Sequence, residues 1–409
     1  MEHRLVIVGS LHENVELVKE AKKRGYYTIV CDGYKDGPGK QFADKAYDID
    51  VRNVDAFSKM CIDEKADGII GSFSDLVFEQ ITKIAEKAGL KWYATTEMLK
   101  YYRNKYEQKK LLEDVGVRVQ KCVKVYGTKD LEKVKMLSFP VVVKPATGWG
   151  SKGIVVLKTV DDIKNYAFEN NTEYVIEEFC SAYEYNCIAF VVNGTVCILG
   201  IADREKTFID DNSVPLLNRV VYPSTVMDKI FDMTNKTLQR FVNKTGQKSG
   251  PLSMQFFYDD DNEEVIVCEI AGRVLAHEHK LIKDCGGSDV NKLLLDTVYC
   301  SDEEVLRNIK PMEKGKYACG LYMMCKRNEL IKDASKAYEL FNNISEENKI
   351  IFCQSGDRFD YSFPYFARIY LQSESRSDLT QRSEYYFDNF FVVGEENENI
   401  AVLHKIERR

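Results

Sequence analysis

The sequence lacks several features that would assign a class of function at once. No apolar run is long enough to cross a bilayer, and the four apolar residues after Met1–Arg4 are too few for a signal peptide. No stretch forms a basic stripe, and the formal net charge of −7 argues against a nucleic-acid partner. We therefore expect a cytoplasmic protein that works without a membrane and without a nucleic acid.

Paired cysteines, repeats and low-complexity tracts are absent as well. The 12 cysteines include no Cys-x-x-Cys and no spacing of the zinc kind, so reduced, buried thiols are expected. Only 8 of the 409 residues are proline. What remains is the composition of an ordinary globular chain, 44% hydrophobic and 30% charged. The length allows roughly two to four domains with ample core.

Strand and helix patterns alternate through the first hundred residues. Apolar runs at 5–8 and 27–31 flank a stretch with helical spacing at 14–24, which predicts a βαβ unit with a parallel sheet. We expect residues 1–100 to form a doubly wound domain whose ligands lie outside the carboxyl ends of its strands. Ser74 and Asp75 follow one such end, although residues of this kind also cap helices.

A strand–loop–strand stretch at 139–157 organises the rest of the chain. Its loop contains three glycines, which can bring backbone N–H groups against an anion. Lys144 stands at the end of the first strand, where a buried lysine must find an anion or lose its charge. Phosphate is the expected ligand, although such a connector can also be a plain hairpin. The loop fits neither the Walker pattern nor the dinucleotide-binding pattern, because a strand follows it.

Further polar residues follow in a fixed order. A strand at 174–178 ends in two adjacent glutamates, which are costly beside an apolar run unless something binds them. A hairpin at 251–270 places Gln255 and Glu269 on neighbouring strands, with Arg273 just beyond. Upstream, the helix at 101–116 carries lysines that we expect to be mostly solvated. Residues 311–409 change to short strands and helices and are expected to form a small α+β appendage.

This ordered set resembles the ATP-grasp superfamily of ligases. The resemblance covers most of residues 1–296 and implies a multidomain α/β and α+β protein, with a doubly wound first domain and a central ATP-grasp domain at 101–310. It implies ATP and Mg²⁺ as cofactors. It implies that Lys105 and Lys144 contact the phosphates and that Glu184 holds the ribose. The flap over the triphosphate would contain Thr147, Gly148, Gly150, Ser151, Lys152 and Gly153. Glu177 would face adenine, and Glu178, Phe179 and Cys180 would form the hinge that pairs with it.

The resemblance also implies the metal site and the catalytic residues. Gln255 and Glu269 would bind magnesium, and Arg273 would act with Lys144 on the transferred phosphoryl group. The chain departs from the family pattern Glu-x-Asn-x-Arg, because Ala271 stands in place of the asparagine ligand. Gln255 replaces the commoner glutamate. These departures put one of two magnesium sites in doubt and, less strongly, catalysis itself.

Two charged stretches have competing interpretations. His277 and His279 would point the same way on an extended segment, but two histidines without a third ligand seldom hold a metal, so we favour a segment that lines the acceptor cleft or simply packs. The charged run at 203–206 is predicted to be a solvated turn. Within it, Arg204 is a candidate for gripping a substrate carboxylate.

We expect the chain to be a carboxylate–amine ligase. ATP would convert a carboxylate into an acyl phosphate, and an amine would then displace phosphate. The expected partners are small-molecule carboxylates and amines, and the resemblance also allows a homodimer. An alternative of another class is a regulatory or scaffold protein that binds ATP without turnover, for which Ala271 is the motivating feature.

Overall fold

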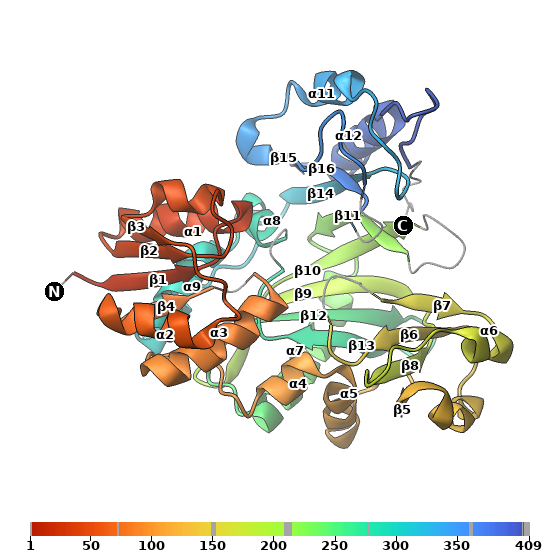
Figure 1. Ribbon diagram of the computed structural model, residues 1–409, viewed down its shortest axis with the longest axis horizontal. Helices are drawn as coiled ribbons and strands as arrows, with labels where there is room; N and C mark the ends of the chain where they lie inside the picture. The colour runs from red at the N-terminus through yellow and green to blue at the C-terminus, as the bar shows by residue number, and fades with distance from the viewer. Residues whose placement is uncertain are drawn as a thin grey trace.

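The computed structural model describes residues 2–71, 73–148, 153–207, 215–275, 278–359, 363–402 and 404. The described strands form three β-sheets, and helices cover their faces (Figure 1). No helix within these ranges is long and apolar enough to cross a bilayer. The architecture is the multidomain α/β and α+β arrangement that the sequence predicts.

The first sheet is parallel, with the strand order β3-β2-β1-β4. Its strands are β1 (Arg4–Val8), β2 (Tyr27–Cys31), β3 (Lys45–Tyr47) and β4 (Gly68–Ile70). Alternate residues of β1 enter two different apolar clusters, as a strand buried on both faces requires. The helices that pack around it are α1 (His12–Lys23), α2 (Val54–Asp63), α3 (Asp75–Ala88) and the short η1 (Pro38–Phe42).

Helix α9 (Val290–Tyr299) also packs on this N-terminal sheet, beside α1 (Figure 1). The close approach depends on Gly68, where a Cβ atom would lie 2.4 Å from the Tyr299 hydroxyl. Residues that the sequence assigns to the middle domain therefore complete the first one. Short helices α8 (His279–Asp284) and α10 (Asp302–Asn308) flank α9 along the chain.

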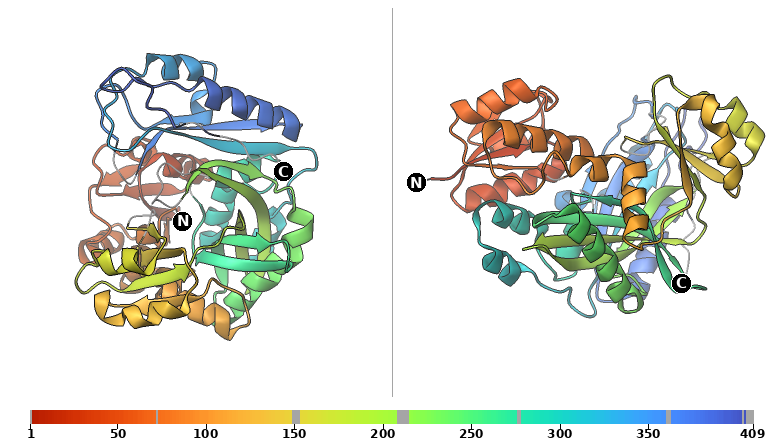
Figure 2. Two further views of the ribbon diagram at one scale, coloured as in Figure 1. Left: turned by 90° about the vertical axis from the view of Figure 1, so that its right-hand side faces the viewer. Right: turned by 90° about the horizontal axis from the view of Figure 1, so that it is seen from below.

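A small antiparallel sheet forms a separate lobe, which projects from the rest of the molecule in the right-hand view of Figure 2. Its strand order is β5-β8-β6-β7. The η2 segment (Gly127–Met136) and α6 (Val160–Asn165) share its apolar cluster. The strands are β5 (Cys122–Val125), β6 (Val141–Pro145), β7 (Val155–Leu157) and β8 (Tyr174–Glu178).

The third sheet is antiparallel and has eight strands, in the order β13-β12-β9-β10-β11-β14-β16-β15. One apolar cluster lies between it and the helices α4 (Leu99–Arg103), α5 (Lys105–Asp114) and α7 (Met227–Thr245). Its strands are β9 (Tyr183–Val192), β10 (Thr195–Thr207), β11 (Leu216–Tyr222), β12 (Ser249–Asp259), β13 (Glu264–Ala271), β14 (Tyr317–Met324), β15 (Lys349–Ile351) and β16 (Tyr365–Ser373).

The C-terminal segment has the expected α+β content but is not a free-standing appendage. Strand β14 pairs directly with β11, so residues 317–373 continue the central sheet. Helices α11 (Ser335–Phe341) and α12 (Arg376–Asn389) cover this end, next to the short η3 (Glu346–Asn348). The sequence could not show this pairing, because β11 was not recognised as a strand.

The prediction of a solvated turn at 203–206 is wrong, because all four residues lie within β10. Asp203 and Glu205 are buried. The Arg219 guanidinium donates to both oxygens of Glu205 at 2.8 and 2.6 Å, and Arg376 of α12 pairs with Asp203. The partners come from distant parts of the chain, which explains why a local charge run appeared to be a solvated turn.

We expect a chain that ends at residue 310 to lose the native fold. Removal of β14 would expose the backbone edge of β11 together with Val220, Tyr222 and Leu281, which share an apolar cluster with Ala318 and Tyr322 of β14. Circular dichroism and size-exclusion chromatography should show an aggregated chain without a cooperative melt. A chain that ends at residue 404 is the control. A monomeric, cooperatively melting chain of residues 1–310 would contradict the continuous-sheet description.

Candidate active site

The strand register places four of the predicted polar residues on one face of the large sheet. Gln255 lies directly opposite Glu269, as the hairpin pattern predicts, and also opposite Asn186. Glu184 is two residues from Asn186 on β9 and lies opposite Arg204 of β10. Directly opposed residues of an antiparallel pair share a face, as do alternate residues of one strand. A polar band therefore crosses the sheet from Glu269 to Arg204.

Glu184 is the centre of this band. Its carboxylate lies 2.7 Å from Nε of Arg204, accepts a hydrogen bond of 2.6 Å from Nε2 of Gln255, and pairs with Lys206. The side chain is almost fully buried. Two cations therefore neutralise one carboxylate here. The arrangement keeps both arginine and lysine in place beside any ligand that contacts the band.

Lys144 does find an anion at the end of its strand. Its ammonium group donates a hydrogen bond of 2.6 Å to Oε1 of Glu177, and Lys109 Nζ lies 3.0 Å from the other oxygen. All three side chains are buried. Burial alone would raise the pKa of Glu177, but the two ammonium groups outweigh it and hold that pKa below its ordinary value. Lys144 likewise stays charged, because Glu177 outweighs the burial that would lower its pKa.

Lys105 joins the lobe to the metal candidates. Its side chain donates to the Gly148 carbonyl at 3.3 Å and lies 3.7 Å from Oε1 of Glu269. Its backbone N–H donates to the Ala146 carbonyl at 2.9 Å, which ties the start of α5 to the loop. Thr147 and Gly153 flank this loop, while Gly150, Ser151 and Lys152 lie outside the described residues. The described start of the loop therefore lies beside Lys105, which in turn lies near Glu269.

The predicted adenine hinge follows directly from β8. Glu178 accepts a hydrogen bond of 2.8 Å from the Ser138 backbone, and the Phe179 N–H donates to the Pro140 carbonyl at 3.0 Å. Cys180 is a free, half-buried thiol whose pKa is raised by burial. These contacts fix the backbone of the strand end against the start of β6. The contact of this segment with adenine stays a prediction.

Arg273 reaches across to the N-terminal domain. Its guanidinium makes two hydrogen bonds of 2.7 Å to the carboxylate of Asp75, the first residue of α3. Burial would raise the pKa of Asp75, but the positive charge of Arg273 outweighs burial and holds that pKa below its ordinary value. Ser74 is the N-cap residue of the same helix, without a side-chain cap bond. An anion that binds Arg273 must therefore compete with Asp75 for the same donors.

The segment before α8 contributes a buried carboxylate. Glu278 is fully buried and accepts hydrogen bonds from Asn186 at 2.6 Å and Tyr222 at 3.0 Å. The His279 ring stacks on Phe73, with ring centroids 5.1 Å apart. Among the described residues no group of three metal-ligating side chains occurs, and His277 lies outside them. Glu278 and His279 are thus packed against residues of β9, β11 and the segment before α3.

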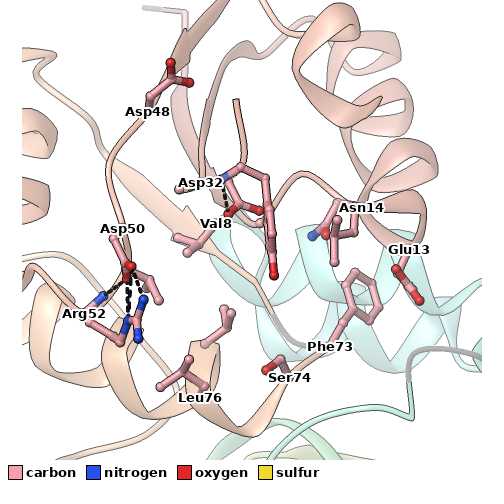
Figure 3. Close-up of a pocket in the computed structure, with 16 residues that line it drawn as sticks. Val8, Glu13, Asn14, Asp32, Asp48, Asp50, Arg52, Phe73, Ser74 and Leu76 are labelled. Atoms are coloured by element: carbon pink, nitrogen blue, oxygen red, sulfur yellow. Dashed lines mark hydrogen bonds and ion pairs between the residues drawn. The ribbon is translucent and has the colours of Figure 1, made fainter. Parts of the chain in front are cut away.

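A cavity of about 780 Å³ lies at the carboxyl ends of β1, β2 and β4, where a doubly wound domain binds ligands (Figure 3). Asp32, Asp48 and Asp50 lie along one side in Figure 3, and Asn14 and Glu13 of α1 lie opposite. Phe73 and Ser74 close the end toward the Asp75–Arg273 pair. The cavity therefore lies beside the start of α3, where Asp75 pairs with Arg273.

Lys109 and Glu278 are among the residues of this site that were not selected from the sequence. Lys109 shares a helix face with Lys105, four residues earlier, and that spacing was the available signal. It was passed over because helical lysines are usually solvated, whereas this one is 1% exposed. Glu278 was noticed only as part of a histidine pair. Its place as a buried hydrogen-bond acceptor could not be predicted from the sequence, because its donors lie on the distant strands β9 and β11.

Comparison with known proteins agrees with this geometry. A family model described as the ATP-grasp domain matches residues 137–280, which include Lys144, Glu184 and Glu269. The chain is 20% identical over 301 residues to a carbamoyl-phosphate synthase of Methanobrevibacter smithii, a match that covers 71% of this chain and 79% of that relative. It is also 29% identical over 163 residues to a formate-dependent phosphoribosylglycinamide formyltransferase of Methanocaldococcus jannaschii.

The formyltransferase match covers 39% of this chain and 42% of that relative, so it spans less than half of either protein. Among solved structures, an L-amino acid ligase from Bacillus licheniformis superposes with a TM-score of 0.81 at 16% sequence identity. That superposition covers 96% of this chain and 98% of the ligase. At this identity the likeness establishes the fold, which extends through the C-terminal segment as well.

Proposed function

Because this chain contains an ATP-grasp domain and has the fold of ATP-grasp ligases, we propose that it joins a carboxylate to an amine at the expense of ATP. A carboxylate oxygen would attack the γ-phosphorus, break the bond to the β-phosphate oxygen and release ADP. The amine nitrogen would then attack the acyl carbon, lose a proton and expel phosphate. The observation that carries the proposal is that Lys105 lies 3.7 Å from Glu269, which is directly opposite Gln255, while Lys144 is kept charged by Glu177.

This chain's own residues suit the first step. Phosphoryl transfer needs positive charge around the γ-phosphate rather than a covalent catalyst. Lys144 and Lys105 would supply that charge to the nucleotide, and Arg273 would supply it at the acceptor side. The Asp75–Arg273 pair would keep the guanidinium aimed at the junction of the two domains until an anion competes for it.

The donor atoms at the metal candidates fit one magnesium ion. Magnesium prefers oxygen ligands and usually takes one or two carboxylates together with phosphate oxygens and water. Nε2 of Gln255 is used by Glu184, so the amide oxygen remains for a cation. Glu269 lies directly opposite and supplies a carboxylate. Ala271 has no ligand atom, so we propose a single protein-held ion. When bound, it would neutralise charge on the transferred phosphoryl group.

Trapping of the acyl phosphate tests the proposal. The purified protein is incubated with ATP, Mg²⁺ and each member of a panel of amino acids and small metabolic acids, with hydroxylamine as the amine. We expect ADP and phosphate only with a suitable carboxylate, together with an equal amount of its hydroxamate. ATP binding without ADP formation across the panel would instead indicate the regulatory alternative. ADP formation that ignores the carboxylate would contradict the acyl-phosphate route.

A further inference from the structure

Arg368 is a buried cation that the proposed chemistry does not use. It lies on β16 and is 7% exposed. Its Nη1 atom donates a long hydrogen bond of 3.4 Å to the Tyr370 hydroxyl, and its Nε atom has no hydrogen-bond partner among the described residues. A guanidinium has five N–H donors, and a buried charge is costly when its donors are unused. Arg368 therefore has spare capacity to bind an anion.

Two aromatic rings hold this guanidinium. Its central carbon lies 5.3 Å from the centroid of the Tyr322 ring and 5.4 Å from that of Phe352. Tyr322 lies directly opposite Arg368 in the sheet register. Rings contact the face of a guanidinium, whereas its N–H groups point outward in its own plane. The packing thus stabilises the cation without occupying the donors that grip a carboxylate.

Arg368 lines a cavity of about 620 Å³ between α1, α8 and the C-terminal strands. Four lysines also line it, and each has a carboxylate within 3 Å; these pairs are Lys19–Glu16, Lys280–Asp284, Lys283–Asp289 and Lys349–Glu346. The carboxylate described near Arg368 is that of Glu13, 3.8 Å from Nη1, which is too far for a hydrogen bond. Arg368 is therefore the lining cation whose charge is least satisfied within the described part of the chain.

The cavity adjoins the one at the strand ends of the first domain. Glu13 lines both this cavity and the one at the strand ends of the first domain, where Figure 3 shows it at the start of α1. Residues Arg368, Tyr370 and Arg204 share one face of the large sheet, because Arg204, Val220, Gly320 and Tyr370 oppose one another in successive strands. Both arginines also act on Tyr365: burial raises the pKa of this residue, and the positive charges of Arg204 and Arg368 oppose that rise.

We propose that Arg368 and Glu13 form a site for a zwitterion, namely an α-amino acid. The carboxylate would take the free donors of Arg368, and the ammonium group would lie beside Glu13. A phosphate dianion fits less well, because one guanidinium faces a lining that also carries Glu13, Glu16, Asp284, Asp289, Glu346 and Glu347. The claim that this amino acid is the amine substrate rests on the function proposed above. The claim that it binds at this site does not.

The test separates the amine site from the chemistry. Hydroxylamine carries no carboxylate, so hydroxamate formation should be unchanged in Arg368→Gln. With each common L-amino acid as the amine, the same variant should raise KM about 10- to 100-fold, because a charge-assisted hydrogen-bond pair contributes this much. Arg368→Lys should recover part of the loss. Lys349→Gln, at the paired and peripheral side of the same cavity, is the matched control.

Alternative amines decide the anionic group. L-Alaninamide keeps the amine but loses the carboxylate, and O-phosphoethanolamine replaces it with phosphate. The proposal is overturned if either reacts as well as the best amino acid, or if Arg368→Gln leaves the amino-acid KM unchanged. If the wild-type protein forms no hydroxamate, the proposed function fails. Calorimetry of the common L-amino acids then decides the site alone: binding that Arg368→Gln abolishes supports it, and no binding to the wild type overturns it.

Discussion

Replacement of Lys144 by methionine should abolish ATP cleavage while the protein still folds. We expect ADP formation to fall by about 10²- to 10³-fold or more, because a positioned charge at a developing anion contributes on this scale. Methionine keeps an unbranched apolar side chain that resembles the lysine stem, and it lacks the ammonium group. Coupled measurement of ADP release, with nucleotide binding measured by calorimetry, would show whether binding or chemistry is lost.

The same substitution should also lower stability. Lys144 is 4% exposed, and its 2.6 Å bond to Glu177 is one of two ion pairs to that carboxylate. Loss of one partner from a buried pair costs about 3–5 kcal/mol. Lys109 keeps Glu177 from being left without a cation, so we expect the lower end of this range. Urea denaturation would measure the change.

Two further lysine variants separate stability from chemistry. Lys109→Met removes the other partner of Glu177, so it should destabilise the fold to a similar extent. Its ammonium group is already used by Glu177 and Gln120, so the rate should fall less than in Lys144→Met. Lys164→Met, an exposed lysine on the same lobe, should change neither quantity. Full ADP release by a folded Lys144→Met protein would exclude a phosphate role for this lysine.

The parts of the structure that could be predicted are those that short-range patterns encode. Alternation of strands and helices was enough for the first domain, and the placement of Gln255 and Glu269 on neighbouring strands followed from one hairpin. The order of Lys144, Glu177, Glu269 and Arg273 was enough for the fold of the central domain. For the first domain and the hairpin the signal lies within about 30 residues of chain, where a period of 2 or 3.6 fixes which side chains share a face. The ordered set from Lys144 to Arg273 was informative through its resemblance to a family.

The parts that could not be predicted depend on partners distant in the chain. The burial of Glu205 requires Arg219, and Asp203 requires Arg376, so neither charge could be recognised as internal. The return of α9 to the first sheet depends on contacts more than 200 residues apart. Arg368 stands in a strand with no motif around it. Its significance depends on the rings and the cavity that the fold places beside it.

Replacement of Glu269 by glutamine should make the reaction depend on much higher magnesium concentrations. The change removes one charge and keeps the shape of the side chain. Because the proposed ion has one protein carboxylate, its loss should weaken magnesium binding at least about 10-fold, equivalent to about 1.4 kcal/mol, and lower the rate at physiological magnesium by more. Titration of ADP formation with MgCl₂ at saturating ATP would measure the shift.

The same variant should bind free ATP at least as well as the wild type when magnesium is absent. Glu269 lies 3.7 Å from Lys105, so its charge competes with a phosphate for that lysine and repels the triphosphate. Its neutralisation removes both effects. Glu264→Gln, on the same strand but exposed and paired with Arg118, is the control and should change neither property. An unchanged magnesium midpoint in Glu269→Gln would place the ion elsewhere, because this change removes the charge of the proposed ligand and keeps the shape of its side chain.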